Sequence, residues 1–320
     1  MDAVLNCMVS EEIAPGTINR ELCQALKRHF QASEVHLLRS YPKAVEIALQ
    51  ASGAREAVTS ALAPGWYRHA AEAAGVSIRC IDVLNDSLAP DQEHVGDAGV
   101  LLVHEPLGLY PPPGYLDGYT LPVIEDITQS FGSSSPEGKP GDFGSIVILG
   151  LEEEGMITAG GGAALVIKQR SFTEPVQQLL DREGPLALLP DMNAALALNQ
   201  LSFFEEHLNR RQEFFELFYK SLLKTRHRSV IEISDQHSCS CFTFPVLLET
   251  DIRSVLKFAR KYKVEISLAF ERSLLAELEL DRELFPRSLP YLLRTIQFPL
   301  YPLLSQDQSK TLVRVLAALP

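Results

Sequence analysis

Short apolar runs alternate with amphipathic stretches along the first half of the chain. Buried strands are predicted where these runs span five to nine residues, at 34–40, 56–62, 76–83, 98–106, 120–126, 144–150 and 163–167. Helices are predicted over 16–31, 43–53 and 67–75. In the first of them Leu22, Leu26 and Phe30 recur at helical spacing. Strands that alternate with helices are typical of an α/β domain with a largely parallel sheet, and we expect one here.

The pattern changes beyond residue 190. Residues 191–224 contain neither Pro nor Gly and repeat apolar residues at spacings of three, four and seven, which predicts one long helix. Strands are then predicted at 240–249, 264–268 and 294–300, and helices over 251–263 and 305–319. Ser305 and Gln308 fit a capping box at the start of the last helix. We therefore expect a large α/β domain over 1–224, which includes the connecting helix 191–224, and a smaller α+β domain over 225–320.

Ligands of open α/β sheets bind outside the carboxyl ends of the strands. In this chain those ends fall at Ser40, Ser60, His104, Asp126 and Gly150. A carboxylate in a crevice of low dielectric keeps a nearby ring nitrogen protonated, so Asp126 is a candidate ligand-binding residue. Gln129, three residues on, could hydrogen-bond the same ligand. The alternative for Asp126 is a helix N-cap or a solvated acid at a strand end.

Composition and charge narrow the class of protein. The chain has 320 residues, 46% of them hydrophobic, and a formal net charge of −12. An acidic chain repels phosphate backbones, so nucleic-acid binding is not expected. No apolar run approaches the roughly 20 residues of a membrane helix and no signal peptide opens the chain, which predicts no membrane and a cytoplasmic protein.

The five cysteines are scattered, at 7, 23, 80, 239 and 241, and do not form a disulfide framework. His237, Cys239 and Cys241 lie close together, but zinc sites space their cysteines by two to four residues and need about four ligands. We expect no metal and interpret the cluster as alternation along a strand; a metal or redox role for Cys239 and Cys241 is the alternative. The phosphate loop of the P-loop proteins, the full dinucleotide fingerprint and the nucleophile elbow of hydrolases are all absent from the sequence.

The most informative segment is 121–167. The run VIEDITQSFGSS at 123–134, the turn GKPGDFGSI at 138–146 and the strand ITAGGGAALVI at 157–167 resemble, in order, motifs of the DegT/DnrJ/StrS family of sugar aminotransferases. The stretches 192–211 and 285–308 resemble its connecting helix and its closing segment. The family consists of fold type I enzymes that use pyridoxal phosphate and act on keto-sugars attached to nucleotides. The resemblance therefore implies an aminotransferase-like fold over most of the chain.

The resemblance also implies roles for single residues. Asp126 matches the family's partner of the pyridine nitrogen, and Gln129 matches a residue at the face of the cofactor or near its ring hydroxyl. Ser40 and Tyr41 lie in the stretch that matches the family's phosphate-binding turn, His104 lies in the stretch LLVHEPLG that matches another family segment, and all three are candidate cofactor-binding residues. Pyridoxal or pyridoxamine phosphate could therefore bind through Asp126 and Gln129.

Other family positions are altered. Gly155 stands where the family has the lysine that forms the Schiff base, and Gly150 stands where it has a phosphate-binding serine. The Gly-Thr of the phosphate turn is replaced by Tyr41-Pro42, and proline offers no N–H to a phosphate. Leu188 replaces an arginine of the family. No catalytic residue is therefore assigned.

Nearby side chains could replace the lysine only if the alignment of the loop shifts. Lys139 matches a turn position of the family, and Lys168 lies beyond the next strand. The acidic run 152–154 could supply bases, but charge runs are more often solvated, and it would repel a phosphorylated cofactor.

Two hypotheses follow. In the first, the chain is an aminotransferase scaffold that no longer transaminates, because the missing lysine both anchors the cofactor and moves the proton. It would act as a homodimer, or as a heterodimer with an active relative, with a nucleotide sugar as a possible ligand. In the second, it is a lysine-independent pyridoxal- or pyridoxamine-phosphate enzyme, a sugar aminotransferase or dehydratase of polysaccharide or sugar biosynthesis.

Overall fold

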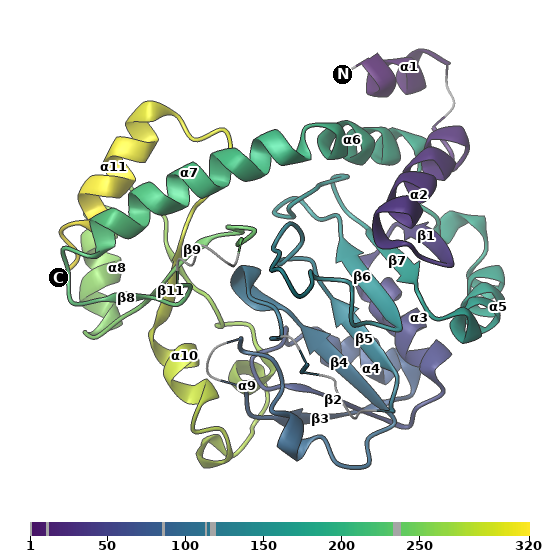
Figure 1. Ribbon diagram of the computed structural model, residues 1–320, viewed down its shortest axis with the longest axis horizontal. Helices are drawn as coiled ribbons and strands as arrows, with labels where there is room; N and C mark the ends of the chain where they lie inside the picture. The colour runs from purple at the N-terminus through teal and green to yellow at the C-terminus, as the bar shows by residue number, and fades with distance from the viewer. Residues whose placement is uncertain (1, 11–12, 85–86, 113, 116–119, 233–237) are drawn as a thin grey trace.

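The computed structural model describes residues 2–10, 13–84, 87–112, 114–115, 120–232 and 238–320 (Figure 1). Two sheets and their helices make up this part of the chain, joined by a long helix that runs across the top of the view. No helix among these residues is long and apolar enough to cross a membrane.

The larger sheet has seven strands in the order β1-β7-β6-β5-β4-β2-β3. Its strands are β1 Glu34–Leu38, β2 Glu56–Ser60, β3 Ser77–Ile81, β4 Val100–His104, β5 Val123–Asp126, β6 Ile146–Gly150 and β7 Ala163–Ile167. Five neighbouring strands are parallel: β3, β2, β4, β5 and β6. At the other edge, β7 runs antiparallel to β6, and β1 runs antiparallel to β7. The prediction of an α/β architecture with a largely parallel sheet is confirmed, although most strands are shorter than the apolar runs that predicted them.

Both faces of this sheet are covered by helices (Figure 1). One face packs on α3 Tyr41–Ser52, α4 Tyr67–Ala74 and α5 Thr173–Glu183, and the other on α2 Thr17–Phe30 and α6 Asp191–Ser202. Within β6, Ile146 and Ile148 belong to the first layer, and Val147 and Leu149 to the second. A strand buried on both faces has no polar positions to alternate with, which is why these runs are continuously apolar.

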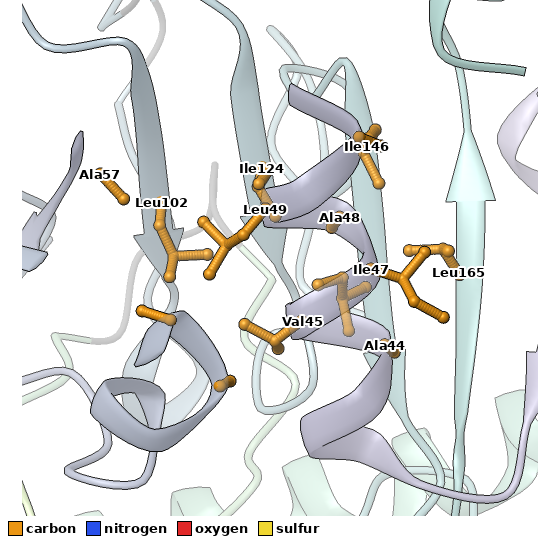
Figure 2. Close-up of a cluster of buried hydrophobic side chains, with 14 of the residues drawn as sticks. Ala44, Val45, Ile47, Ala48, Leu49, Ala57, Leu102, Ile124, Ile146 and Leu165 are labelled. Atoms are coloured by element: carbon orange, nitrogen blue, oxygen red, sulfur yellow. The ribbon is translucent and has the colours of Figure 1, made fainter. Parts of the chain in front are cut away.

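Helix α3 lies across the middle of the sheet (Figure 2). Ala44 and Ala48 face the strands together with larger side chains of the same helix, and both are fully buried. Their small side chains let the backbone of α3 approach the sheet closely. The first turn of this helix lies near the ends of the central strands, because Tyr41 hydrogen-bonds Asp126 at the end of β5.

The segment expected as one helix over 191–224 forms two, α6 and α7 Phe204–Leu222. They meet at Phe203, whose backbone (φ −107°, ψ 9°) departs from the helix although no Pro or Gly is present. At its other end α6 contributes Asp191, whose carboxylate accepts hydrogen bonds from the N–H groups of Gly16, Ile18 and Asn19. These are unsatisfied donors at the start of α2, so one side chain fixes the two helices together.

The smaller sheet has the order β10-β11-β9-β8 and is antiparallel. Its strands are β8 Arg228–Ser229, β9 Phe244–Leu247, β10 Ser267–Leu268 and β11 Thr295–Phe298. It packs against α7, α8 Ile252–Lys261 and α11 Gln306–Leu316 through a core that includes Phe215, Phe218 and Phe244. The capping box of Ser305 and Gln308 is present.

The remaining elements are short. They are α1 Asp2–Ser10, α9 Leu274–Glu277, α10 Ser288–Arg294 and 3-10 turns at Gln92–His94, Pro106–Gly108, Arg170–Phe172, Pro185–Ala187 and Arg282–Leu284. The segment around α9 binds the exit of β2, since the N–H groups of Leu274 and Leu275 donate to the carbonyls of Ala63 and Ala61. The two sheets are thus held together by backbone hydrogen bonds as well as by α7.

Candidate functional site

The carboxyl ends of β4 and β5 lie side by side in the middle of the large sheet. His104 and Asp126 end these strands and are paired residues in their ladder. The exit of β6 is adjacent, because Gly150 donates its N–H to Thr128 Oγ1 at 2.8 Å. The structure therefore brings together three of the strand ends that the sequence singled out.

Asp126 is completely buried and surrounded by donors. Its Oδ2 accepts hydrogen bonds from the phenols of Tyr41 and Tyr67. Its Oδ1 accepts from the N–H of Thr128 at 3.1 Å and from Oγ1 of the same residue at 2.6 Å. His104 Nδ1 lies 3.7 Å from Oδ2. Every lone pair of the carboxylate thus faces a protein donor.

These contacts decide the charge of the cluster. Burial alone would raise the pKa of Asp126, but the adjacent His104 and the hydrogen bonds from Thr128 and Tyr41 hold it below its usual range. Burial and the adjacent carboxylate raise the pKa of Tyr41 and of Tyr67 well above the value of a free phenol. The stable arrangement is therefore an ionised Asp126 with two protonated phenols donating to it.

Tyr41 reaches Asp126 from the first turn of α3. Its N-cap is Ser40, an exposed residue whose Oγ accepts from the N–H of Lys43 at 3.3 Å. The Tyr41 ring meets Trp66 edge-on with 4.8 Å between centroids, and Trp66 meets Tyr67 in the same way at 4.7 Å. Three aromatic rings therefore fill the space beside the buried carboxylate.

Gln129 forms hydrogen bonds with neighbouring segments of the chain. Its side-chain Oε1 accepts a hydrogen bond from the N–H of Leu107 at 2.7 Å, and its backbone carbonyl accepts one from Ser240 Oγ at 2.7 Å. The first contact holds the 3-10 turn that follows β4, and the second reaches the smaller sheet's side of the molecule. The hydrogen bonds of Gln129 therefore fix the surrounding segments, and none of them involves Asp126.

The loop between β6 and β7 carries Gly155. Its N–H donates to the carbonyl of Glu152 at 3.0 Å, which closes a tight turn. A Cβ built on Gly155 would lie 2.8 Å from the carbonyl oxygen of Ile157 and 3.1 Å from that of Glu152. Any side chain here would press on the backbone of its own loop, so the turn is shaped for glycine.

The other charged groups of this region are engaged elsewhere. Lys168 donates to the carbonyl of Gly141 at 2.7 Å and lies 3.7 Å from Asp142. Glu152, an exposed residue, accepts from the N–H of Gly162 at 3.3 Å, and Glu153 and Glu154 are also exposed. The interpretation of 152–154 as a solvated run agrees with this exposure.

Sequence reasoning missed several members of the cluster. Tyr67 opens a predicted helix, and no spacing rule connects it to Asp126, 59 residues later. Thr128 could have been found, because it lies two residues beyond a strand-end aspartate, where a hydroxyl can bind back to the carboxylate. A second buried pair also escaped notice, Glu105 at the exit of β4 and Glu125 in β5.

Glu125 accepts the N–H groups of Gly141, Phe143 and Gly144, which holds negative charge on it although burial raises its pKa. Burial and the neighbouring Glu125 raise the pKa of Glu105 well above its usual value. Glu105 is therefore the protonated member of the pair, and Ser130 Oγ donates to it. This pair lies on the face of β5 away from Asp126 and stabilises the 139–144 turn.

The cysteine cluster does not form a metal site in the part of the chain that the structure describes. Within those residues no three or more His, Cys, Asp or Glu side chains are grouped to hold an ion. His237 lies outside the described residues. Cys239 and Cys241 are both free thiols, and Cys241 has a positive φ of 51°, so the segment is not the regular strand that we expected.

The model of the DegT/DnrJ/EryC1/StrS aminotransferase family matches residues 1–317. The chain belongs to this family. A curated relative, the UDP-4-amino-4,6-dideoxy-N-acetyl-beta-L-altrosamine transaminase of Campylobacter jejuni subsp. jejuni serotype O:23/36 (strain 81-176), is 23% identical over 320 residues. That match covers 88% of this chain and 85% of the relative.

Two solved structures of sugar-modifying enzymes share the fold. The sugar aminotransferase CalS13 from Micromonospora echinospora superimposes with a TM-score of 0.83 and 18% identity, covering 99% of this chain and 95% of that one. The GDP-4-keto-6-deoxy-D-mannose-3-dehydratase of E. coli with bound hydrated PLP gives 0.83 at 14% identity, covering 98% and 95%. The expected fold type I aminotransferase architecture is therefore confirmed.

Proposed function

We propose that this member of the DegT/DnrJ/EryC1/StrS family is a scaffold that does not transaminate and acts as a partner subunit in sugar biosynthesis. The observation that carries the proposal is the closed cluster at Asp126. In the family, the residue that matches Asp126 pairs with the pyridine nitrogen of the cofactor. Here Tyr41 and Tyr67 both donate to its Oδ2, and the carboxylate is fully buried beneath them.

The positions expected to hold the phosphate support the same proposal. Pro42 removes one N–H from the first turn of α3, and Ser40 Oγ accepts another, from Lys43. A side chain at Gly150 would have its Cβ 2.9 Å from Thr128 Cγ2 and 3.0 Å from Tyr41 Cε1. The tyrosine has therefore taken the room that a phosphate-binding serine would need.

The position expected to hold the lysine supports it further. Gly155 has no amine, and its loop leaves no space for a side chain without a shift of the backbone. Lys168, the nearest lysine beyond the following strand, is bound to Gly141 and Asp142. The residues present therefore do not fit pyridoxal phosphate.

A scaffold that binds no cofactor can contribute to sugar biosynthesis only together with a partner subunit. The proposed partner is a second copy of this chain or an active relative from the same family, with a nucleotide sugar as a possible shared ligand. The curated relative from Campylobacter is a transaminase whose name places its amino sugar on UDP. Light scattering after size-exclusion chromatography, on the chain alone and co-expressed with such a transaminase, tests this part of the proposal.

The cofactor experiment is direct. The purified chain is incubated with pyridoxal phosphate, reduced with borohydride, digested and mapped by mass spectrometry. We expect no site-specific lysine adduct, because the cluster at Asp126 leaves no room for the ring. The heat-denatured chain serves as the control for random labelling of surface lysines.

Two results would overturn the proposal. A stoichiometric adduct on one lysine, absent from the denatured control, would show a working attachment site. Tight binding of pyridoxamine phosphate without an adduct would instead support a lysine-independent sugar aminotransferase or dehydratase.

A further inference from the structure

The segment 238–242 crosses from the smaller sheet to the exit of β5. Ser240 donates its N–H to Ser133 Oγ at 2.8 Å and its hydroxyl to the carbonyl of Gln129. On the other side Arg211, a buried residue of α7, donates to the carbonyl of Cys241 at 3.2 Å. The backbone between the two cysteines is thus held from both sides.

Within this segment each thiol lies against the backbone of the other cysteine. The N–H of Cys241 donates to Cys239 Sγ at 3.1 Å, and Cys241 Sγ lies 3.5 Å from the carbonyl of Cys239. The left-handed backbone at Cys241 produces this turn, and such a φ is unusual for a residue other than glycine. Cα atoms two residues apart are at most about 7 Å from each other, and a turn brings them closer, into the range that a disulfide spans.

The two thiols also differ in reactivity. The neighbouring Cys241 thiol and its backbone N–H lower the pKa of Cys239, and the neighbouring Cys239 together with burial raises the pKa of Cys241. Cys239 is partly exposed, while Cys241 is buried. A reactive thiolate beside a buried thiol that can resolve it is the arrangement of redox-sensing cysteine pairs.

We propose that Cys239 and Cys241 are a peroxide-reactive pair that closes to an intramolecular disulfide. The Cys239 thiolate attacks an oxygen of hydrogen peroxide, the O–O bond breaks, hydroxide leaves and Cys239 becomes a sulfenic acid. Cys241, deprotonated as it reacts, attacks the Cys239 sulfur, the S–O bond breaks and a second hydroxide leaves. The hydroxides take up the two thiol protons, so two thiols and one peroxide give one disulfide and two waters.

Ser240 is the residue between the two cysteines, so closing this small disulfide ring would change its backbone conformation. Its hydrogen bonds to Ser133 and Gln129 join this segment to the large sheet, together with the backbone bridge between Ser238 and Ser134. Oxidation is therefore expected to loosen 129–134, and hydrogen exchange of that segment should rise in the oxidised protein.

The test uses the full chain. Reduced protein is treated with one equivalent of hydrogen peroxide, blocked with N-ethylmaleimide and measured by intact mass and peptide mapping. We expect an oxidised species about 2 Da lighter before alkylation, with two fewer alkylated cysteines and a cross-linked peptide over 239–241. Cys23 and Cys80 are internal controls, because burial raises the pKa of each thiol to about 11.

Variants assign the order of events. Cys241→Ser should stop at a sulfenic acid on Cys239 that dimedone traps, and Cys239→Ser should abolish the reaction. Cys80→Ser is the matched control and should oxidise like the wild type. In the reduced wild type, N-ethylmaleimide should label Cys239 at least about tenfold faster than Cys80 at neutral pH.

Three results would overturn the proposal. They are equal labelling rates for Cys239 and Cys80, oxidation of Cys239 to a sulfinic acid without a disulfide, and cross-linking only between chains on a non-reducing gel. If Cys241→Ser does not fold, the peptide map of the wild type decides alone.

Discussion

At the scale of single residues, the phenols of Tyr41 and Tyr67 both donate hydrogen bonds to Oδ2 of Asp126. We predict that Tyr41→Phe and Tyr67→Phe each lower the free energy of unfolding by about 1.5–3 kcal/mol, the usual value of a hydrogen bond to a buried charge. Each variant leaves the ionised carboxylate short of a donor. Urea denaturation measures the loss, and Tyr262→Phe, a substitution away from this cluster, is the control.

The double variant adds a sharper test. Because both phenols bind the same oxygen, the two losses should not add, and the coupling should exceed about 0.5 kcal/mol. Two single variants as stable as wild type would mean that Asp126 is not held as the structure describes.

The buried acid pair predicts a dependence on pH. Glu105 keeps its proton in the fold at a pH where the unfolded chain has lost it, because burial and Glu125 raise its pKa. Its contribution is therefore complete below its pKa in the unfolded chain and is lost as pH rises through its pKa in the fold. Each unit by which folding raises the pKa of Glu105 corresponds to about 1.4 kcal/mol of stability that is lost in this way.

Glu105→Gln removes this titration, and its amide oxygen can still accept from Ser130 Oγ. We expect the variant to gain stability over wild type as pH is raised from 5 to 8, measured by urea midpoints at both values. Glu279→Gln, an exposed residue, should show no such gain. A gain that shrinks with rising pH would contradict the assignment of the proton to Glu105.

At the scale of elements, the β6–β7 loop is expected to reject a restored lysine. We predict that Gly155→Lys lowers stability and forms no borohydride-stable adduct with pyridoxal phosphate, since its Cβ would meet the carbonyls of Ile157 and Glu152. Glu153→Lys places a lysine at an exposed position of the same loop and should be tolerated. Transamination by the single variant Gly155→Lys would show that much more of the ancestral site remains.

The elements themselves were largely predictable, because the strands of a sheet that is buried on both faces are continuous runs of apolar residues in the sequence. Ile146 to Leu149 illustrate this, with alternate residues in opposite layers. The break at Phe203 was not predictable, because no helix-breaking residue marks it. Asp126 could be placed at a strand end, whereas its partner Tyr67 could not, since that contact exists only once α4 has packed on the sheet.

At the scale of the whole molecule, Asp82 connects the two sheets. It follows β3 and accepts the N–H groups of Arg287 and Ser288, at 2.9 and 2.8 Å, and the Ser288 hydroxyl at 2.6 Å. Arg287 also pairs with Asp91. Burial alone would raise the pKa of Asp82, but these hydrogen bonds hold it below the usual value.

An acid whose pKa is lowered in the fold contributes stability above its unfolded pKa of about 4, and that contribution is lost as pH falls through the lower, folded value. We predict that Asp82→Asn costs about 1.5–3 kcal/mol at neutral pH and that the difference from wild type shrinks in acid. Arg287→Ala should cost less, because its side chain is 35% exposed and its backbone N–H remains. Hydrogen exchange should rise over 285–294 in Asp82→Asn, and should stay at the wild-type level in Asp97→Asn, a variant of an exposed acid. Equal exchange in both variants would mean that the contact does not hold the two sheets together.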